Sequence, residues 1–231
     1  RPRSLVAFVN TRPPMHSKRI REKVKQDYDS IASEFSETRQ HAWPEFDLFK
    51  PYLKADFKVL DLGCGNGRLL DFLKKAGVKS YVGVDQSAGL LDHARKKFPD
   101  ALFVEGDMAE LSEATFPYAS FDAIFMMASF HHLPKSDQLP VLKAVQKLLK
   151  PDGFLFMTNW NLFRFSFWKE WLRMFFLRPY GWKGLPVLWQ NRIQRYYYAF
   201  TRAELRGLLQ AEGFSVLLEE SGRNFVTVAR L

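Results

Sequence analysis

One stretch of the chain constrains its fold more than any other. Residues 57–67 read Phe-Lys-Val-Leu-Asp-Leu-Gly-Cys-Gly-Asn-Gly, so a short apolar run leads into a loop with glycine at every second position. The apolar run predicts a buried strand at 59–62, and helix-forming residues resume at Arg68. Because glycine adopts positive φ and lets the backbone approach a ligand, the stretch predicts a nucleotide-binding turn between strand and helix.

The charge beside this loop indicates which nucleotide it binds. A dinucleotide-binding loop carries glycine at its first, third and sixth places, but the sixth place counted from Gly63 is Arg68. Asp61 precedes the loop, and its carboxylate would repel a pyrophosphate. The same carboxylate would attract a cation, such as the ammonium group of S-adenosylmethionine (SAM).

Two further apolar runs end in acidic residues that suit the same ligand. The strand expected at 81–84 ends at Asp85, which lies 20 residues after the second glycine of the loop. An acidic residue there can accept hydrogen bonds from both ribose hydroxyls. The strand expected at 101–104 leads to Asp107 and Met108. We expect Asp107 to accept from the adenine amino group while Met108 packs on the ring.

The remaining segments alternate between helix and strand patterns. We expect helices at 68–76, 87–98, 137–149 and 202–211, and strands at 121–127, 154–159, 214–220 and 224–231. Strands that alternate with helices predict right-handed crossovers and a parallel sheet. The fold class is therefore α/β, with 231 residues forming one large domain with an insertion.

Together these motifs resemble the class I SAM-dependent methyltransferases. They are Asp61-Leu-Gly-Cys-Gly-Asn-Gly67, Val84-Asp85, Gly106-Asp107-Met108 and Phe121-Asp122, spaced as in that family over residues 57–160. The resemblance implies an enzyme with a Rossmann-like sheet, mostly parallel with one antiparallel strand, and helices on both faces. It implies SAM as cofactor, S-adenosylhomocysteine as product, and cofactor contacts from Tyr28, Asp61, Gly63, Cys64, Gly65, Asp85, Gln86, Asp107, Met108 and Met127.

The segment before the first strand narrows the resemblance. From Ser17 the apolar residues recur at helical spacing as far as Phe35, with Tyr28 among them, so one face should lie on the domain. With Thr-Arg39 and Trp43-Pro that follow, the segment resembles the methyltransferases that esterify the carboxymethyl group on the wobble uridine of tRNA. It is similar, more loosely, to small-molecule methyltransferases in which a tyrosine-bearing helix covers the SAM pocket. The first resemblance implies tRNA as partner, with Arg39 and Trp43 at the substrate.

The chain divides into a basic N-terminal segment with lid helices, 1–56, and a methyltransferase domain, 57–231, with an insertion at 160–200 after the fifth strand. The insertion is rich in aromatic and basic residues, and Phe163, Phe167, Trp171 and Phe175 follow one face of an expected helix, as core or lid. Basic residues among exposed rings also suit single-stranded nucleic acid, and an amphipathic basic helix suits a membrane surface.

Near its end, the insertion carries a second link to the tRNA family. Arg195-Tyr-Tyr-Tyr198 resembles an Arg-Tyr-Tyr-His motif of that family, which implies Arg195 and Tyr197 at the substrate. Tyr198 stands where the family has histidine, which puts in doubt any role of that position in substrate choice.

Two adjacent histidines follow the fourth strand. Ligands of open α/β sheets lie beyond the carboxyl ends of the strands, so His131 and His132 should face the reaction zone. Neighbouring loop residues rarely converge on one ion, and no second Cys/His cluster exists, so we expect no metal. A histidine at this place is implicated in function in the tRNA family, which implies His131 or His132 beside Arg39 in catalysis without distinguishing the two.

Charge and composition bear on the partners. The net charge of +9 is concentrated in residues 1–25 and 161–203, which carry +7 each, whereas the remainder carries −5. Two basic segments around an acidic core favour a polyanionic partner, the alternative being solvated basic faces. Cys64 alone allows no internal disulfide. We expect a cytoplasmic protein, since no signal-peptide core follows Arg1 and no apolar stretch could span a membrane; Met15 is a plausible natural start.

Three functions remain open from the sequence. The first is a SAM-dependent methyltransferase that esterifies a carboxymethyl group on tRNA, where an ionised carboxylate needs no general base. The second is a small-molecule or lipid O-, N- or C-methyltransferase, for which the histidines could accept a proton. The third is a SAM- or RNA-binding module without catalysis. Eukaryotic members of the tRNA family also work with a small zinc-binding activating subunit, and the sequence leaves open whether this chain needs one.

Overall fold

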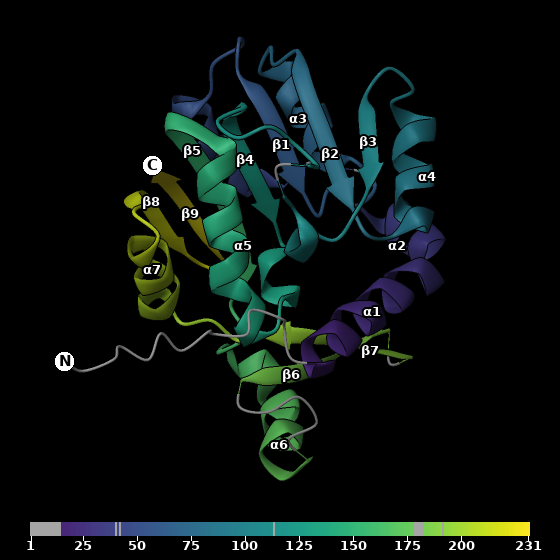
Figure 1. Ribbon diagram of the computed structural model, residues 1–231. Helices are drawn as coiled ribbons and strands as arrows, with labels where there is room; N and C mark the ends of the chain where they lie inside the picture. The colour runs from purple at the N-terminus through teal and green to yellow at the C-terminus, as the bar shows by residue number, and fades with distance from the viewer. Residues whose placement is uncertain (1–14, 40, 42, 113, 178–182, 191) are drawn as a thin grey trace, which may run out of the picture.

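The computed structural model of the protein describes residues 15–39, 41, 43–112, 114–177, 183–190 and 192–231 (Figure 1). Its helices are α1 (Met15–Ser30), α2 (Ala32–Thr38), α3 (Arg68–Lys75), α4 (Ala88–Lys97), α5 (Lys135–Leu148), α6 (Trp168–Leu177) and α7 (Arg202–Ala211). Short 3₁₀ turns are η1 (Pro44–Tyr52), η2 (Met108–Glu110), η3 (Phe130–His132) and η4 (Phe165–Phe167). Its strands are β1 (Lys58–Leu62), β2 (Ser80–Asp85), β3 (Leu102–Glu105), β4 (Phe121–Met127), β5 (Leu149–Trp160), β6 (Gly184–Trp189), β7 (Ile193–Tyr198), β8 (Ser215–Ser221) and β9 (Asn224–Arg230). Among the described helices, none combines the length and apolarity needed to cross a bilayer.

Seven strands form one sheet in the order β3-β2-β1-β4-β5-β9-β8. Neighbouring strands from β3 to β5 run parallel, whereas β9 pairs antiparallel with both β5 and β8. The predicted Rossmann-like sheet with one antiparallel strand is therefore confirmed. Because β1 lies between β2 and β4, the strand order reverses at β1, where ligands of such sheets bind.

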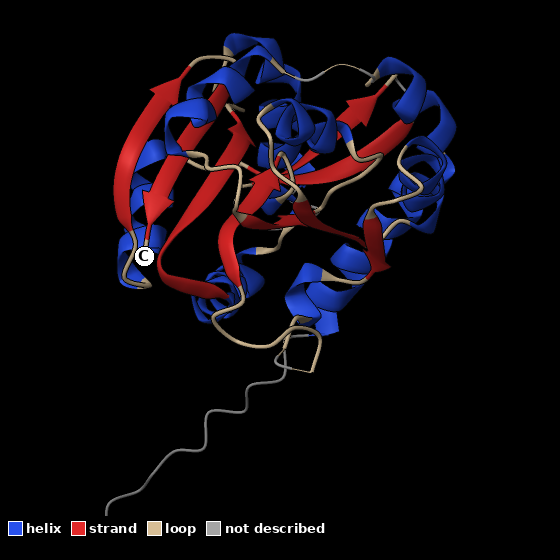
Figure 2. Cartoon of the chain, turned by 90° about the horizontal axis from the view of Figure 1, so that it is seen from above, coloured by secondary structure: helices blue, strands red, loops and turns tan. Residues whose placement is uncertain are grey.

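Alternating side chains of the central strands build a core on each face of the sheet. On β1, Val59 packs with Phe49 of η1 and the side chains of α3 and α4. The next residue, Leu60, packs on the opposite face with Val141 of α5 and Leu205 of α7. This alternation is the two-residue period of a strand buried on both sides. Figure 2 shows the resulting layers, with helices on both sides of the sheet.

The N-terminal helices pack against the carboxyl end of the sheet. The helix expected from Ser17 to Phe35 is interrupted at Ile31, so α1 and α2 are separate helices. Ile20 and Val24 of α1 join the core that contains α5, and α1 crosses the carboxyl ends of the strands (Figure 1). Much of the basic segment expected before α1 lies outside the described residues.

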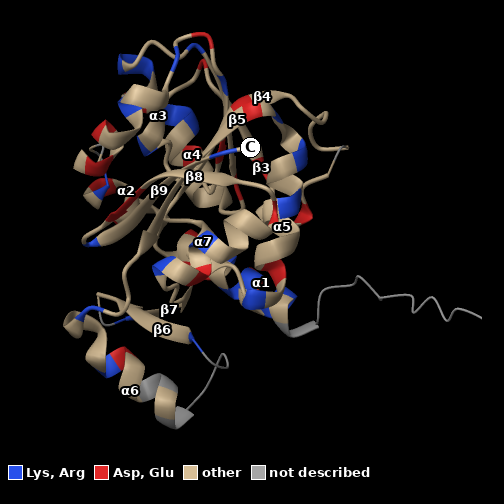
Figure 3. Ribbon diagram, turned by 90° about the vertical axis from the view of Figure 1, so that its left-hand side faces the viewer, with Lys and Arg blue, Asp and Glu red and all other residues tan. Residues whose placement is uncertain are grey.

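The insertion contains a β-hairpin that the sequence did not predict. Strands β6 and β7 form a separate antiparallel pair, although Pro186 makes this run a poor strand candidate. Helix α6 projects beyond the hairpin (Figures 1 and 3). Phe167 and Trp171 pack against the hairpin core, but Phe163 and Phe175 are exposed, so only half of the expected apolar face is covered.

The loop after β1 gives a stability test. Gly63 has φ +77°, and a Cβ there would lie 2.3 Å from Cβ of Ser129. Gly63→Ala should therefore lower the free energy of unfolding by roughly 2–4 kcal/mol, measured by urea denaturation. Gly207→Ala is the control, because nothing lies within 4 Å of its added methyl and alanine favours the helix by about 0.5–1 kcal/mol. Equal unfolding midpoints for the two variants would contradict this account of the loop.

Candidate cofactor and acceptor site

A cavity opens at the carboxyl ends of β1, β2 and β4, where the strand order reverses. Its empty volume is about 1100 Å³ with the open mouth included. Every residue predicted to act in the site lies on its wall: Tyr28, Arg39, Trp43, Asp61, Gly63, Cys64, Gly65, Asp85, Gln86, Asp107, Met108, Met127, His131, His132, Arg195 and Tyr197. The structure thus brings all of them together, although their roles stay predictions.

The glycine loop is fastened to the end of β2 by Asp85. The backbone N–H of Gly65 donates to one carboxylate oxygen at 2.8 Å, and that of Ser87 donates to the other at 2.9 Å. Burial raises the pKa of Asp85 to about 6, although these backbone bonds favour the ionised form. The carboxylate retains lone pairs toward the cavity, as recognition of a ribose diol requires.

Asp61 is a buried carboxylate with one free oxygen. The hydroxyl of Tyr81 donates to Oδ2 at 2.9 Å, whereas Oδ1 has no hydrogen-bond partner among the described residues. Burial raises the pKa of Asp61 to about 7 despite the bond from Tyr81, and the nearby charge of Asp85 adds to the rise. A cationic ligand would satisfy this oxygen and favour its ionised form, so the site fits the ammonium group of SAM.

The far end of the cofactor wall carries Asp107 and a residue that the sequence analysis missed. Oδ1 of Asp107 accepts from the backbone N–H of Ala109 at 2.9 Å, and Oδ2 accepts from Nε of Arg21 at 2.6 Å. Arg21 lines the cavity from α1. It lies seven residues before Tyr28 and thus on the same helical face, a spacing that could have identified it.

A chain of hydrogen bonds fixes His132 at the other end of the cavity. Its Nδ1 lies 2.8 Å from the carbonyl of Tyr196, so Nδ1 carries the proton and Nε2 accepts from the Tyr28 hydroxyl at 2.8 Å. Arg195 donates from Nη1 to the same hydroxyl at 3.0 Å. Burial lowers the pKa of His132 to about 3, and the charge of Arg195 adds to the fall, so the ring is neutral at pH 7.

His131 is fully buried with a different pattern of bonds. Its Nδ1 accepts from the backbone N–H of Trp160 at 3.3 Å, so Nε2 carries the proton, and the side chain of Asn159 lies near the ring as a weak hydrogen-bond partner. The ring stacks on Tyr197 at a centroid distance of 4.9 Å. Burial lowers the pKa of His131 well below its usual value, and the neighbouring His132 and Arg195 lower it further. His131 is therefore a neutral, buried ring.

Three arginines give this end of the cavity a positive wall. The guanidinium groups of Arg39 and Arg195 each lie 4.8 Å from the ring of Trp189, and that of Arg68 lies 4.2 Å from Trp43. Within the described part of the chain, none of the three forms an ion pair with a carboxylate. Burial lowers the pKa of Arg68 to about 10, and the charge of Arg39 adds to the fall. The sequence analysis placed Arg68 only at the start of a helix.

Successive residues of β7 point alternately to the cavity and to the core. Arg195 and Tyr197 line the cavity, whereas Tyr196 and Tyr198 point into the core beneath it. The Tyr198 hydroxyl donates to Glu204 of α7 at 2.5 Å. Tyr198 therefore lies outside the cavity wall, and its difference from the family pattern leaves the wall unchanged.

Known proteins are similar to this chain in sequence and in fold. Residues 59–153 match the family model of a methyltransferase domain. A putative methyltransferase of Encephalitozoon cuniculi is 34% identical over 200 residues, which cover 84% of this chain and 88% of that protein. The chain belongs to the SAM-dependent methyltransferases, and SAM is its cofactor.

More specific similarities come from tRNA (carboxymethyluridine(34)-5-O)-methyltransferases. The Schizosaccharomyces pombe protein is 27% identical over 217 residues, which cover 85% of this chain and 90% of that protein. The Xenopus tropicalis protein is 31% identical over 143 residues, which cover 62% of this chain but only 22% of that longer protein.

Among solved structures, a putative methyltransferase of Haloferax volcanii in complex with the Trm112 methyltransferase activator is similar in fold. The TM-score is 0.68 at 20% identity, and the match covers 90% of this chain and 96% of that one.

The pKa of Asp61 gives a test of its contact with SAM. Because the proton and the SAM ammonium group compete for this carboxylate, and because an α-amino group loses its own proton near pH 8, SAM affinity should fall roughly fivefold between pH 7.5 and pH 6. Asp61→Asn should bind SAM more weakly at pH 7.5 and lose most of this pH dependence, as measured by calorimetry. Asp47→Asn, at an exposed site, is the control. A wild-type affinity that does not change with pH would contradict the assignment.

Proposed function

We propose that the protein transfers the methyl group of SAM to a carboxylate on tRNA, the carboxymethyl group of the wobble uridine. The observation that carries this proposal is the pair of guanidinium groups, Arg39 and Arg195, that lie over Trp189 without an ion-pair partner among the described residues. Their mutual repulsion in a partly buried site favours an anion between or beside them. A carboxylate can accept two parallel hydrogen bonds from each planar guanidinium group.

The histidines support an acceptor that is already ionised. Nε2 of His131 carries a proton, and the basic nitrogen of His132 is occupied by the hydroxyl of Tyr28. With a pKa of about 3, His132 is also a poor base at neutral pH. A phenol or an amine would need a proton acceptor, whereas a carboxylate needs none.

The proposed mechanism uses orientation more than proton transfer. When bound, SAM supplies a methyl group that its sulfonium activates for in-line displacement. Arg39 and Arg195 orient the carboxylate. Trp160 and Tyr197 reduce the access of water. Orientation of this kind can supply several kcal/mol of the barrier reduction.

On the cofactor side we propose three anchors, each argued from the cavity wall. Asp61 binds the ammonium group, Asp85 the ribose hydroxyls and Asp107 the adenine amino group. Tyr28 covers the methionine part from α1, with its hydroxyl held by His132 and Arg195. Cys64, Gln86 and Met127 complete the predicted contacts, and Met108 packs against the adenine.

The tRNA assignment is supported by charge and by similarity. The segments 1–25 and 161–203 carry a net charge of +7 each, which suits a polyanion. The S. pombe relative acts on tRNA by its name and matches along most of both chains. Because the H. volcanii structure pairs a similar fold with an activator, we also propose that a small activating subunit assists this enzyme.

The experiment that tests the proposal is a methylation assay with labelled SAM and total tRNA, followed by digestion to nucleosides. The label should appear in a base-labile ester on uridine, and binding of tRNA should weaken steeply with salt. Label on small molecules alone, with little response to salt, would support the small-molecule alternative and contradict the proposal. If the protein binds SAM but forms no S-adenosylhomocysteine, it is a binding module without catalysis, and the proposal is contradicted.

Arg39 gives the sharpest single substitution. Arg39→Ala should reduce turnover at least about 100-fold, because the carboxylate loses a charge-assisted contact, while SAM affinity changes by less than about threefold. Arg206→Ala is the matched control, since Arg206 is an exposed arginine that pairs with Glu219 outside the cavity and lies beyond both basic segments. Turnover retained by Arg39→Ala would remove Arg39 from the mechanism.

A further inference from the structure

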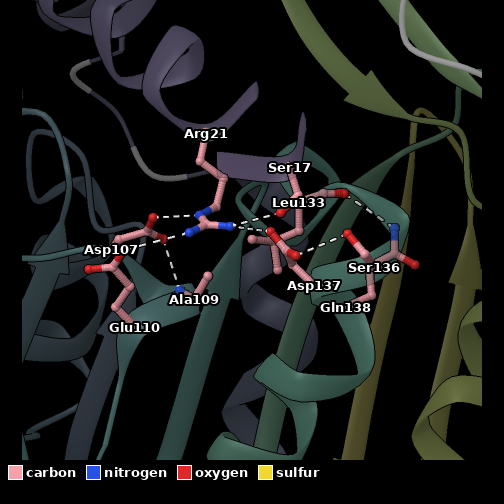
Figure 4. Close-up of polar contacts among 9 residues, drawn as sticks. All are labelled: Ser17, Arg21, Asp107, Ala109, Glu110, Leu133, Ser136, Asp137 and Gln138. Atoms are coloured by element: carbon pink, nitrogen blue, oxygen red, sulfur yellow. Dashed lines mark hydrogen bonds and ion pairs between the residues drawn. The ribbon is translucent and has the colours of Figure 1, made fainter. Parts of the chain in front are cut away.

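A buried arginine of α1 contacts both Asp107 on the cavity wall and Asp137 of α5 (Figure 4). The side chain of Arg21 is only 5% exposed. Its Nε donates to Asp107 at 2.6 Å, and its Nη1 pairs with Asp137 in the first turn of α5. Nη2 lies 3.6 Å from Glu110, and Nη1 also lies 3.3 Å from the Ser17 hydroxyl.

Burying this ion pair costs hydration free energy. Asp137 is 3% exposed, so the Arg21–Asp137 pair has lost nearly all of its hydration, which offsets much of the attraction between the charges. Burial by itself would lower the pKa of Arg21, but the bonds and charges of Asp107 and Asp137 outweigh it and raise the pKa. Arg21 is therefore a fixed cation beside Asp107 on the cavity wall.

Arg21 also belongs to a stripe of α1 that follows the cavity. Arg21, Val24 and Tyr28 all line the cavity, from Asp107 at one end toward His132 at the other. Beyond Tyr28, Asp29 accepts from the Ser87 hydroxyl at 2.6 Å and from the Gly89 N–H at 3.2 Å. Helix α1 is thus held beside the cavity by Arg21 and, near its C-terminal end, by Asp29.

Asp107 depends on Arg21 for its orientation. One carboxylate oxygen is held by the backbone N–H of Ala109 and the other by Arg21, so the plane of the carboxylate is fixed by two donors. The Ala109 donor belongs to the same loop as Asp107, whereas the Arg21 donor is on α1.

We propose that Arg21 is a positioning residue for the adenine of the cofactor: it holds the Asp107 carboxylate in the orientation that accepts from the adenine amino group, and so makes adenine recognition depend on α1 lying in place. The inference rests on the proposed contact between adenine and Asp107. It is independent of the methyl acceptor.

The test compares two ligands by calorimetry: S-adenosylhomocysteine and S-inosylhomocysteine, in which a carbonyl oxygen replaces the adenine amino group. The wild-type protein should prefer the adenine ligand by roughly a hundredfold, because the carbonyl cannot donate to Asp107. Arg21→Met together with Asp137→Asn should reduce that preference about tenfold, mainly through weaker binding of the adenine ligand. The double change avoids leaving Asp137 buried and unpaired, which would threaten folding.

Two controls separate this role from general stability. Asp137→Asn alone keeps the Arg21–Asp107 bond and should keep the ligand preference. Arg19→Met changes an exposed cation of the same helix and should do the same. A double variant that keeps the wild-type preference, or that weakens both ligands equally, would overturn the role of Arg21. A wild-type protein that does not distinguish the ligands would instead overturn the proposed place of the adenine.

Discussion

The site is organised around the carboxylate of Asp61, which is buried at the end of β1 with one oxygen that no described residue satisfies. A buried carboxylate without a counter-charge is unfavourable, and the raised pKa of Asp61 expresses that cost. A cation at the cavity relieves it. The glycine loop that follows has no side chains to fill the space, so the same turn supplies both the attraction and the room for a sulfonium cofactor.

The cavity is electrostatically divided along its length. Its cofactor wall carries carboxylates, whereas its other end carries guanidinium groups that lie over tryptophan rings. Tyr28 belongs to the guanidinium-bearing end, where its hydroxyl bonds to both His132 and Arg195. This polarity suits a cationic methyl donor at one end and an anionic acceptor at the other. Helix α1 lines the cavity at both of these ends, through Arg21 and Tyr28, so it is part of the site as well as its cover.

The sequence predicted the fold well where the signal was local. Strand Phe121–Met127 and helix Arg202–Ala211 have the bounds expected from their apolar periods. The β6–β7 hairpin was not predicted, because Pro186 weakens the signal of its first strand. The site residues that belong to a sequence motif were predicted. Arg21 was not predicted, because it acts through Asp107 and Asp137. These carboxylates are distant from it in the sequence and close to it only in the fold.

The most direct measurement is a crystal structure of the protein with S-adenosylhomocysteine, which keeps the ammonium group of the cofactor. The account predicts that this ammonium lies within hydrogen-bonding distance of Oδ1 of Asp61, with the ribose hydroxyls at Asp85. A cofactor whose amino-acid end points away from Asp61, leaving that oxygen without a cation, would contradict the central claim.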